Sequence, residues 1–377
     1  MLYLDNAATT LKKPIGVWGS MIYNTLRFSV NAGHGGHYYS IKGAEGIYET
    51  AEKLADFLGC DNPERIAFTQ NATHALNVGI RGYLTKDDHI VTTAMEHNSV
   101  LRTLEEWCDY TVVDAEIDGT VRPEKIKKAI TPKTKLILVN HVSNVCGTVQ
   151  DLGRISKIAK DRGIKFMVDG AQSVGSIPID VKKMGIDMLA LSGHKGLMSP
   201  LGVGALYVAE GIELEPLITG GTGSDSKNLR QPRQMPDIIH SGTMNAPAII
   251  ACGRGIDYIN KRGVEEIGEY EVYLAMRLIE KLKNMDNVLV YGKTSKEGRN
   301  STVLFNIAGR DSTEISGILN DKFGIATRGG YHCAYLAHKA IGSEEFGGVR
   351  ASFGAFNTIY AVDGLTDAVY KLSKNRV

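Results

Sequence analysis

A single lysine follows a short apolar run near the middle of the chain. Residues 187–191 (DMLAL) have the composition of a buried strand, and Ser192, Gly193, His194 and Lys195 come directly after them. A lysine is rarely buried unless it is paired or chemically used. Its amine can bond covalently to an aldehyde cofactor such as pyridoxal 5'-phosphate (PLP). Lys195 is therefore a candidate covalent anchor, and a surface lysine in a turn is the alternative.

Other polar side chains fall at the ends of predicted strands. Asp169 closes the run 165–169, where its carboxylate can pair with a protonated pyridine nitrogen and make the ring an electron sink. Gln172 and Asn144 follow strands at spacings that can reach the ring's phenolic oxygen. Taken alone, Asp169 is equally well explained as a turn residue or a helix cap.

The segment 69–76 passes from a strand directly into a helix. Backbone N–H groups around Ala72 and the Thr73 hydroxyl are placed there to hold a phosphate. Ordinary N-capping by Asn71 or Thr73 is the alternative. Ser192 and His194, which flank the lysine, can complete the phosphate cradle.

His97 follows the predicted strand 89–93. It can stack on a cofactor ring and exchange protons with it. The competing interpretation is a solvent-facing histidine at the start of a helix.

Composition restricts the class of protein. The chain has 377 residues, of which 43% are hydrophobic and 23% charged, and its net charge is +1. These values are ordinary for a globular protein and give no electrostatic case for nucleic acid or an anionic membrane. The N-terminus shows no basic segment followed by an apolar one, and no run approaches the roughly 20 apolar residues of a membrane helix. We therefore expect a cytoplasmic protein.

The cysteines are five in number, scattered, and without CxxC spacing, which argues against a disulfide framework or a structural zinc site. We expect free thiols and no metal site. Cys333 differs from the others because His332 precedes it, Arg328 is close, and Gly329 and Gly330 lead into it. The full set is Cys60, Cys108, Cys146, Cys252 and Cys333.

The elements that position these residues alternate along the first part of the chain. Helical patterns, such as 152–162 and a helix starting at Pro123, separate short β-rich runs. Alternation of this kind predicts an α/β domain with a mainly parallel sheet, which binds ligands at the carboxyl ends of its strands. The clearest strands are 65–69, 89–93, 135–139 and 165–169.

The alternation of short strands and helices is interrupted after Pro247. A long helical stretch through Leu278 leads into a second α/β pattern. We therefore expect a large domain at 13–258 and a small domain formed by 1–12 and 259–377. The second pattern has strands at 288–291, 301–305 and 349–353 and helices near 314–319 and 362–372.

The motifs, in their order along nearly the whole chain, resemble the class V aminotransferase-like PLP enzymes, and within them the cysteine desulfurases and selenocysteine lyases. The matching segments are 3–10 (YLDNAATT), 31–33, 36–37, 95–97 (MEH), 141–144 (HVSN), 169–172 (DGAQ), 192–195 (SGHK), 241–245 (SGTMN), 350–353 (RASF) and 357–358.

The resemblance implies a PLP-dependent transferase of fold type I. Its large domain would contain a mainly parallel, seven-stranded type of sheet, and a smaller α/β domain would lie toward the C-terminus. PLP would be attached to Lys195 in a homodimer, with Thr243 reaching the phosphate in the partner subunit. Arg350 would clamp the substrate α-carboxylate, with Asn144 beside it. A structural ion pair is the alternative role for Arg350.

The segment 328–334 (RGGYHCA) looks like the R-x-G-x-H-C-A pattern of the group II cysteine desulfurases. This resemblance implies conversion of L-cysteine to L-alanine, with a persulfide formed on Cys333 for transfer to a protein acceptor. The short segment between Cys333 and Arg350 predicts a confined thiol. Tyr331 stands where many relatives carry another histidine, and Tyr335 stands where proline or glutamine is common. Because of these two departures, the resemblance does not specify which protein accepts the sulfur.

Other activities remain open from the sequence. A selenocysteine lyase acting on L-selenocysteine is the nearest, because selenium leaves more easily and can be eliminated without a protein thiol. Another class V aminotransferase-type enzyme would make Cys333 incidental. A non-enzymatic scaffold is disfavoured, because the full set of candidate site residues is present: Lys195, Asp169, His97, Arg350 and Cys333. The sulfur could serve iron–sulfur clusters, thiolated RNA, molybdenum cofactor or selenium metabolism.

Overall fold

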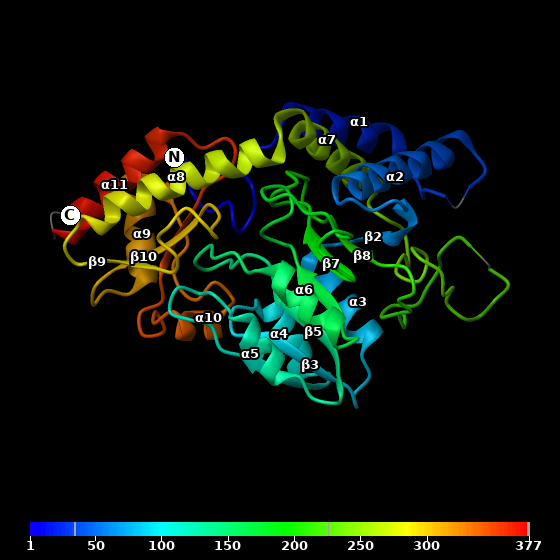
Figure 1. Ribbon diagram of the computed structural model, residues 1–377. Coiled ribbons are helices and arrows are strands. Elements are labelled where there is room, and N and C mark those ends of the chain that lie inside the picture. Colours follow the sequence, from blue (N-terminus) through cyan, green and yellow to red (C-terminus); the bar gives the residue numbers. More distant parts are fainter. Residues whose placement is uncertain (34, 225, 375–377) are drawn as a thin grey trace.

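A seven-stranded sheet forms the centre of the computed structural model, which describes residues 1–33, 35–224 and 226–374 (Figure 1). Its spatial order is β2-β8-β7-β6-β5-β3-β4. The strands are β2 (Ile66–Thr69), β3 (His89–Thr93), β4 (Asp109–Val113), β5 (Thr134–Asn140), β6 (Lys165–Asp169), β7 (Met188–Ser192) and β8 (Gly204–Val208).

The sheet is mainly parallel, as the sequence predicts. Strands β4, β3, β5, β6 and β7 run in one direction. Only β8 is reversed, because it pairs antiparallel with both β7 and β2. The carboxyl ends of the parallel strands therefore open at one edge, where ligands bind in such sheets.

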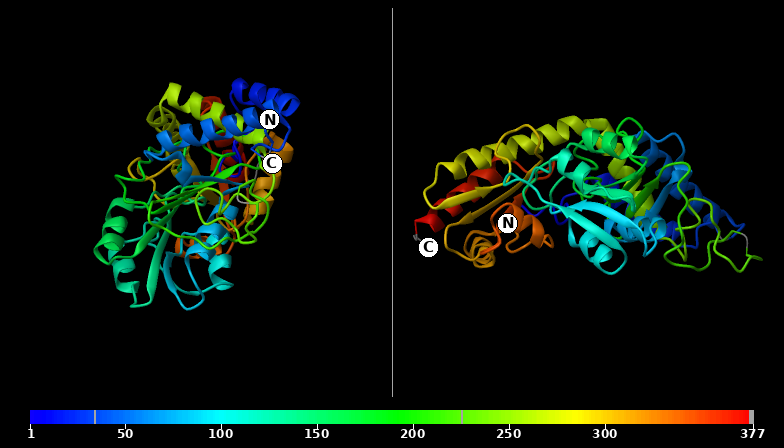
Figure 2. Two further views of the ribbon diagram at one scale, coloured as in Figure 1. Left: turned by 90° about the vertical axis from the view of Figure 1, so that its right-hand side faces the viewer. Right: turned by 60° about the horizontal axis from the view of Figure 1, so that its bottom comes forward.

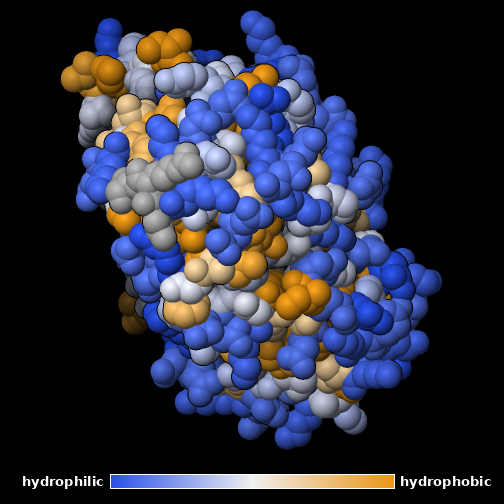
Figure 3. All heavy atoms as spheres, turned by 90° about the vertical axis from the view of Figure 1, so that its left-hand side faces the viewer, coloured by the Kyte–Doolittle hydropathy of each residue, from blue (hydrophilic) through white to orange (hydrophobic). Residues whose placement is uncertain are grey.

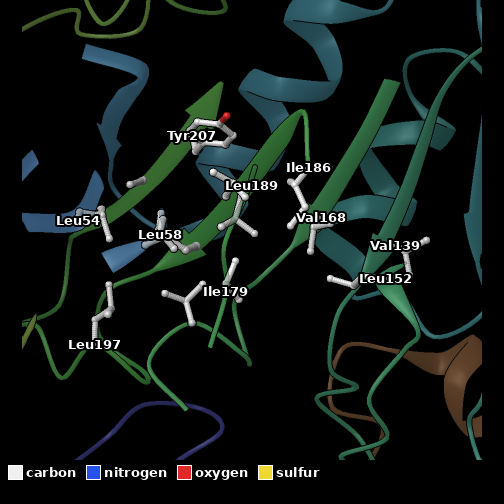
Figure 4. Close-up of a cluster of buried hydrophobic side chains, with 14 of the residues drawn as sticks. Leu54, Leu58, Val139, Leu152, Val168, Ile179, Ile186, Leu189, Leu197 and Tyr207 are labelled. Carbon is white, nitrogen blue, oxygen red and sulfur yellow. The ribbon is translucent and has the colours of Figure 1, made fainter. Parts of the chain in front are cut away.

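Helices cover both faces of this sheet, and each face has its own apolar cluster. On one face, Val139, Val168 and Leu189 from the strands point toward Leu58 and Leu152 (Figure 4). The covering elements are α1 (Ile15–Phe28), α2 (Tyr38–Phe57), the 3-10 turn Pro63–Arg65, α3 (Ala72–Tyr83), α4 (Asn98–Glu105), α5 (Pro123–Ala129), α6 (Leu152–Asp161) and α7 (Ala246–Arg262).

A three-stranded antiparallel sheet of order β12-β10-β9 forms the second part. The N-terminus belongs to this part, because β1 pairs in parallel with β11. Its strands are β1 (Leu2–Tyr3), β9 (Val288–Tyr291), β10 (Thr302–Ile307), β11 (Ile325–Ala326) and β12 (Val349–Ser352). Its helices are α8 (Val264–Lys283), α9 (Ser312–Phe323), α10 (Tyr335–Ala340) and α11 (Ile359–Ser373).

The long helical stretch expected after Pro247 is two helices. Gly263 ends α7 with φ at 91°, a conformation that favours glycine, and α8 begins at the next residue. Figures 1 and 2 show α8 running from α7 toward the end of the molecule where both termini lie. The domain boundaries at residues 12 and 258 stay a prediction.

The surface at that end of the molecule is mostly hydrophilic, with apolar residues in small patches (Figure 3). Among the described residues, no helix is both long and apolar enough to span a bilayer.

The close approach of Gly196, directly after Lys195, to the backbone of Val174 can be tested by substitution. A Cβ added there would fall on the carbonyl oxygen of Val174. We expect Gly196→Ala to lower the free energy of unfolding by about 2 kcal/mol, because the backbone must move apart. Gly317 on α9 is the control, because it is exposed and has open space around it. Gly317→Ala should raise stability by about 0.5 kcal/mol. Guanidinium unfolding of the apoproteins measures both, and equal effects would contradict the prediction.

Candidate active site

A cavity of about 310 Å³ opens at the carboxyl edge of the large sheet. It gathers most of the residues that the sequence singles out, although they lie far apart in the chain. The ones that line it are Ala72, Thr73, His97, Asn144, Asp169, Gln172, Ser192, His194, Lys195 and Arg350.

Two predicted residues do not line this cavity. Thr243 is exposed and borders a neighbouring cavity of about 580 Å³, together with residues 69–71. Cys333 lies outside the lining as well, but its loop neighbours Arg328 and His332 belong to it.

The start of α3 is built as an anion site. Asn71 caps the helix, because its side chain accepts a hydrogen bond from the His74 amide at 3.0 Å. Capping is thus correct for Asn71 but not for Thr73, whose hydroxyl meets Ser99 Oγ at 2.7 Å. Ser192 Oγ accepts from the Ala72 amide at 3.0 Å and ties this helix to the end of β7. Helix N-termini favour negative charge, so this corner suits a phosphate.

Asp169 and Lys195 supply opposite charges inside the cavity. Asp169 is buried and accepts a hydrogen bond from the Ala171 amide at 2.9 Å. Burial raises the pKa of Asp169 and lowers the pKa of Lys195 to about 8. About a tenth of Lys195 is therefore the neutral, nucleophilic amine at pH 7. Gln172 donates its Nε2 to the Ala7 carbonyl at 2.9 Å.

His97 begins α4 and faces the cavity as well. Its Nδ1 accepts from the Ser99 amide at 3.0 Å, which makes it the N-cap of the helix. Burial lowers the pKa of His97 to about 4, so the ring is neutral at pH 7. With Nδ1 accepting, the single ring proton lies on Nε2.

Arg350 is buried at 1% exposure and held by two partners. Its Nη2 forms an ion pair with Asp5 at 2.6 Å, and its Nη1 donates to the Asn144 carbonyl at 2.9 Å. The structural ion pair considered from the sequence therefore exists. It does not use the whole guanidinium, since Nε of Arg350 and Oδ1 of Asn144 have no hydrogen-bond partner among the described residues.

Cys333 sits on a strained loop. His332 and Cys333 have φ angles of 53° and 57°, and each left-handed non-glycine residue costs about 1 kcal/mol. The Asn98 amide donates to the Cys333 carbonyl at 2.7 Å, and Asn144 Nδ2 to the His332 carbonyl at 2.8 Å. Arg328 Nη2 lies 3.6 Å from the Cys333 sulfur. The backbone is fixed, but the side chain is exposed in the single chain, so the expected confinement of the thiol is wrong in this respect.

The cavity fits PLP. Three residues that line the cavity have a buried polar atom without a hydrogen-bond partner in the described part of the chain: His194 Nδ1, Asn144 Oδ1 and Arg350 Nε. A ligand with both donors and acceptors would satisfy such atoms. The helix terminus at Ala72 and Thr73 suits the phosphate, the buried carboxylate of Asp169 suits a protonated ring nitrogen, and Lys195 suits an aldehyde.

Comparison with known proteins agrees with this geometry. The family model for class V aminotransferases matches residues 2–365, and the chain belongs to that family. A probable cysteine desulfurase from Methanothermobacter thermautotrophicus is 34% identical over 99% of this chain and 94% of the relative. A cysteine desulfurase from Haloferax volcanii is 30% identical over 98% of this chain and 88% of its own length.

Solved structures give the same result for the fold. The apo structure of a cysteine desulfurase from Thermococcus onnurineus has a TM-score of 0.92 at 33% identity, covering 99% of this chain and 95% of its own. A cysteine desulfurase from Escherichia coli, in an S-sulfonic acid form, has a TM-score of 0.87 at 25% identity, covering 100% and 95%. The fold class predicted from the sequence is confirmed.

Three contributors to the site escaped the sequence analysis. Asp5 was within a matched motif but had no role assigned, Asn98 contributes its backbone amide, and Glu96, next to His97 in the chain, is fully buried. An acidic residue beside a candidate histidine was the available signal. Glu96 Oε1 accepts from Thr93 Oγ1 at 2.7 Å and from the Asn140 amide at 3.0 Å.

Burial raises the pKa of Glu96 to about 8. The folded protein therefore keeps this proton at pH values where the unfolded chain, near 4.5, has lost it, and stability falls as pH rises between these values. Glu96→Gln mimics the protonated acid and removes the titration. We expect the wild type to lose about 3 kcal/mol relative to the variant between pH 5 and 8. Denaturant unfolding of both apoproteins across this range measures it, and a constant difference would contradict it.

Proposed function

We propose that this protein is a PLP-dependent cysteine desulfurase, which converts L-cysteine to L-alanine and leaves the sulfur as a persulfide on Cys333. The observation that carries the proposal is the placement of Cys333, with Arg328 beside its sulfur, at the margin of the cavity that contains Lys195. The named activity of the relatives supports the same conclusion.

The cofactor site follows from the lining residues. Lys195 would carry PLP, Asp169 would face the ring nitrogen, and His97 would lie against the ring. Ala72, Thr73, Ser192 and His194 would hold the phosphate, while Gln172 and Asn144 would serve the phenolic oxygen. When bound, PLP supplies an electron sink for the substrate.

The substrate is held through its carboxylate. Arg350 retains a free Nε and is oriented by Asp5 and by the Asn144 carbonyl. A planar guanidinium binds both oxygens of a carboxylate at once. Burial of Arg350 excludes water, so this interaction is stronger than on a surface.

The sulfur step uses the Cys333 thiolate as nucleophile. Its sulfur bonds to the substrate sulfur while the substrate Cβ–S bond breaks, and that electron pair stays with the carbon. L-cysteine and the Cys333 thiol thus become L-alanine and the Cys333 persulfide without any further reagent. The Arg328 guanidinium stabilises negative charge on the attacking sulfur.

Protons are handled by two side chains that line the cavity. Lys195, with its pKa of about 8, can accept a proton from the substrate Cα near neutral pH. His97 carries one proton on Nε2 and can donate it when the carbon chain is released as alanine.

The first experiment is incubation of the PLP-loaded protein with L-cysteine in the absence of reductant. We expect one sulfur added to the peptide that contains Cys333 and stoichiometric L-alanine, and Cys333→Ala should lower alanine formation by at least about 100-fold. Cys108→Ala is the matched control, because Cys108 is also a partly accessible free thiol. An unmodified Cys333 with no alanine would overturn the proposal, and a wild-type protein that forms alanine from L-selenocysteine but not from L-cysteine would indicate the selenocysteine lyase.

The proposal extends to a homodimer. Helix α1 exposes an apolar stripe, in which Ile15, Ile22 and Leu26 are 86%, 61% and 81% exposed. A second copy of the chain would cover this stripe and bring its own Thr243 to the neighbouring phosphate site. Exposed Thr243 outside its own chain's cavity is consistent with that role. A cytoplasmic location with a protein sulfur acceptor is part of the proposal, and the five free cysteines agree with it.

Subunit mixing tests the shared site. Lys195→Ala homodimers should be inactive, and Thr243→Ala homodimers should lose most of their activity when PLP is limiting, which is the condition of the test. If Thr243 serves the partner subunit, a mixed dimer contains one intact site, so refolding the two variants together at equal amounts should restore about a quarter of wild-type activity. Alanine formation measures it. Absence of recovery, with mixed dimers detected by mass spectrometry, would place Thr243 in the site of its own chain.

A further inference from the structure

A buried pair of histidines lies behind the Cys333 loop and has no part in the steps above. His332 belongs to the loop, His338 lies on α10, and Ser343 follows that helix; none is more than 3% exposed. His332 Nδ1 is 3.0 Å from His338 Nε2, and the planes of the two rings are within 14° of parallel. His338 Nδ1 is 2.8 Å from Ser343 Oγ.

The hydrogen bonds fix both tautomers. His332 Nε2 is 3.0 Å from the Arg328 carbonyl, which can only accept, so this nitrogen carries the proton. In a neutral ring Nδ1 must then accept, and the donor is Nε2–H of His338. The single proton of the Ser343 hydroxyl has two acceptors within reach, His338 Nδ1 at 2.8 Å and the His338 carbonyl at 3.4 Å. We assign it to Nδ1, because that contact is shorter and Nε2 already carries the proton of the His338 ring. Burial lowers the pKa of both rings, that of His338 to about 4, which agrees with two neutral histidines.

This arrangement is not a route for protons to Cys333. Both ring nitrogens of His332 are occupied, one by a carbonyl and the other by His338, and neither meets the sulfur. A carbonyl oxygen cannot pass a proton on. The group that does approach the sulfur is the Arg328 guanidinium.

The series of hydrogen bonds from Ser343 through His338 and His332 to the Arg328 carbonyl instead holds the two ends of the Cys333 loop together. The Arg328 carbonyl accepts from His332 Nε2 at 3.0 Å and from the Arg350 amide at 2.8 Å, so both of its lone pairs are used. The backbone of Arg328 is thereby held beside Arg350 of β12, and the His332 ring is held against the Arg328 carbonyl. The left-handed turn at His332 and Cys333 is closed by these contacts.

We propose that His338 is a positioning residue for the Cys333 nucleophile: by donating to His332 Nδ1 it fixes the tautomer that grips the Arg328 carbonyl, and so keeps the Arg328 guanidinium at the Cys333 sulfur. The inference rests on the proposed role of Cys333. Ser343 acts one step further back, because its hydroxyl fixes the tautomer of His338.

The reactivity of the Cys333 thiol reports whether the Arg328 guanidinium stays at the sulfur, and it can be measured without turnover. In the PLP-loaded enzyme at pH 7, alkylation of Cys333 by iodoacetamide is followed by peptide mass. The thiol is already exposed, so we expect His338→Leu to slow the reaction by about fivefold through loss of the arginine contact rather than to speed it. His338→Gln retains an N–H donor at the place of Nε2 and should stay within about twofold of wild type.

A matched control lies on the same loop. Tyr331 packs its ring against His338 and donates its hydroxyl to the Glu344 carbonyl at 2.9 Å. Tyr331→Phe removes that bond and leaves the histidines intact, so alkylation should be unchanged. If His338→Leu does not fold, Ser343→Ala is the milder variant, and it should slow alkylation by about twofold.

Histidine tautomers are observed directly by ¹⁵N NMR of histidine-labelled holoenzyme, in which His338→Gln identifies the His338 signals by their loss. We expect Nε2–H on both rings in the wild type, and a changed His332 signal in Ser343→Ala. Kinetics add a third readout: His338→Leu should lower kcat for L-cysteine and leave KM within about twofold, because the carboxylate contact at Arg350 is untouched.

An Nδ1–H tautomer at His332, or wild-type alkylation in a folded His338→Leu enzyme, would overturn this inference. Failure of the proposed function is distinguishable, because the wild type incubated with L-cysteine would then form no alanine and add no sulfur to Cys333, whatever the tautomer and alkylation results are.

Discussion

The contact between Arg350 and Asp5 joins parts of the chain that are more than 340 residues apart. Asp5 follows the first strand, Arg350 lies on β12, and the second guanidinium bond reaches the Asn144 carbonyl after β5. A buried arginine must be paired, since an isolated charge in a low dielectric is very costly. Asp5 and Arg350 both belong to the second part of the molecule, so the bond to the Asn144 carbonyl is the one that links the small sheet to the carboxyl edge of the large sheet, where the cavity lies.

The Cys333 loop depends on that junction. Arg328 is paired through its backbone with Arg350, and His332 and Cys333 are held by Asn144 and Asn98 from the large sheet's side. The two left-handed residues persist because these bonds over-determine them. Placement of the nucleophile near the cavity is thus a consequence of the way the two sheets meet.

Burial shifts the pKa values of the charged groups in the site and so sets the protonation state of each one. Lys195 becomes a partly neutral amine, Asp169 stays available for a cationic partner, and His97 is a neutral donor. Desolvation by burial is the largest cause of each pKa shift, and nearby charges only modify it. Glu96, without an ionic partner, takes up a proton instead.

The sequence by itself determined the fold class and most of the cavity lining, because strand ends and the turn after β7 are set by local apolar patterns and parallel strands bring their ends together. It did not reveal Asp5, the tautomer chain of His338, the exposure of the Cys333 thiol or the break at Gly263. Only the tertiary structure decided these. Pairing, burial and ring orientation depend on residues distant in the chain, and no local period encodes them.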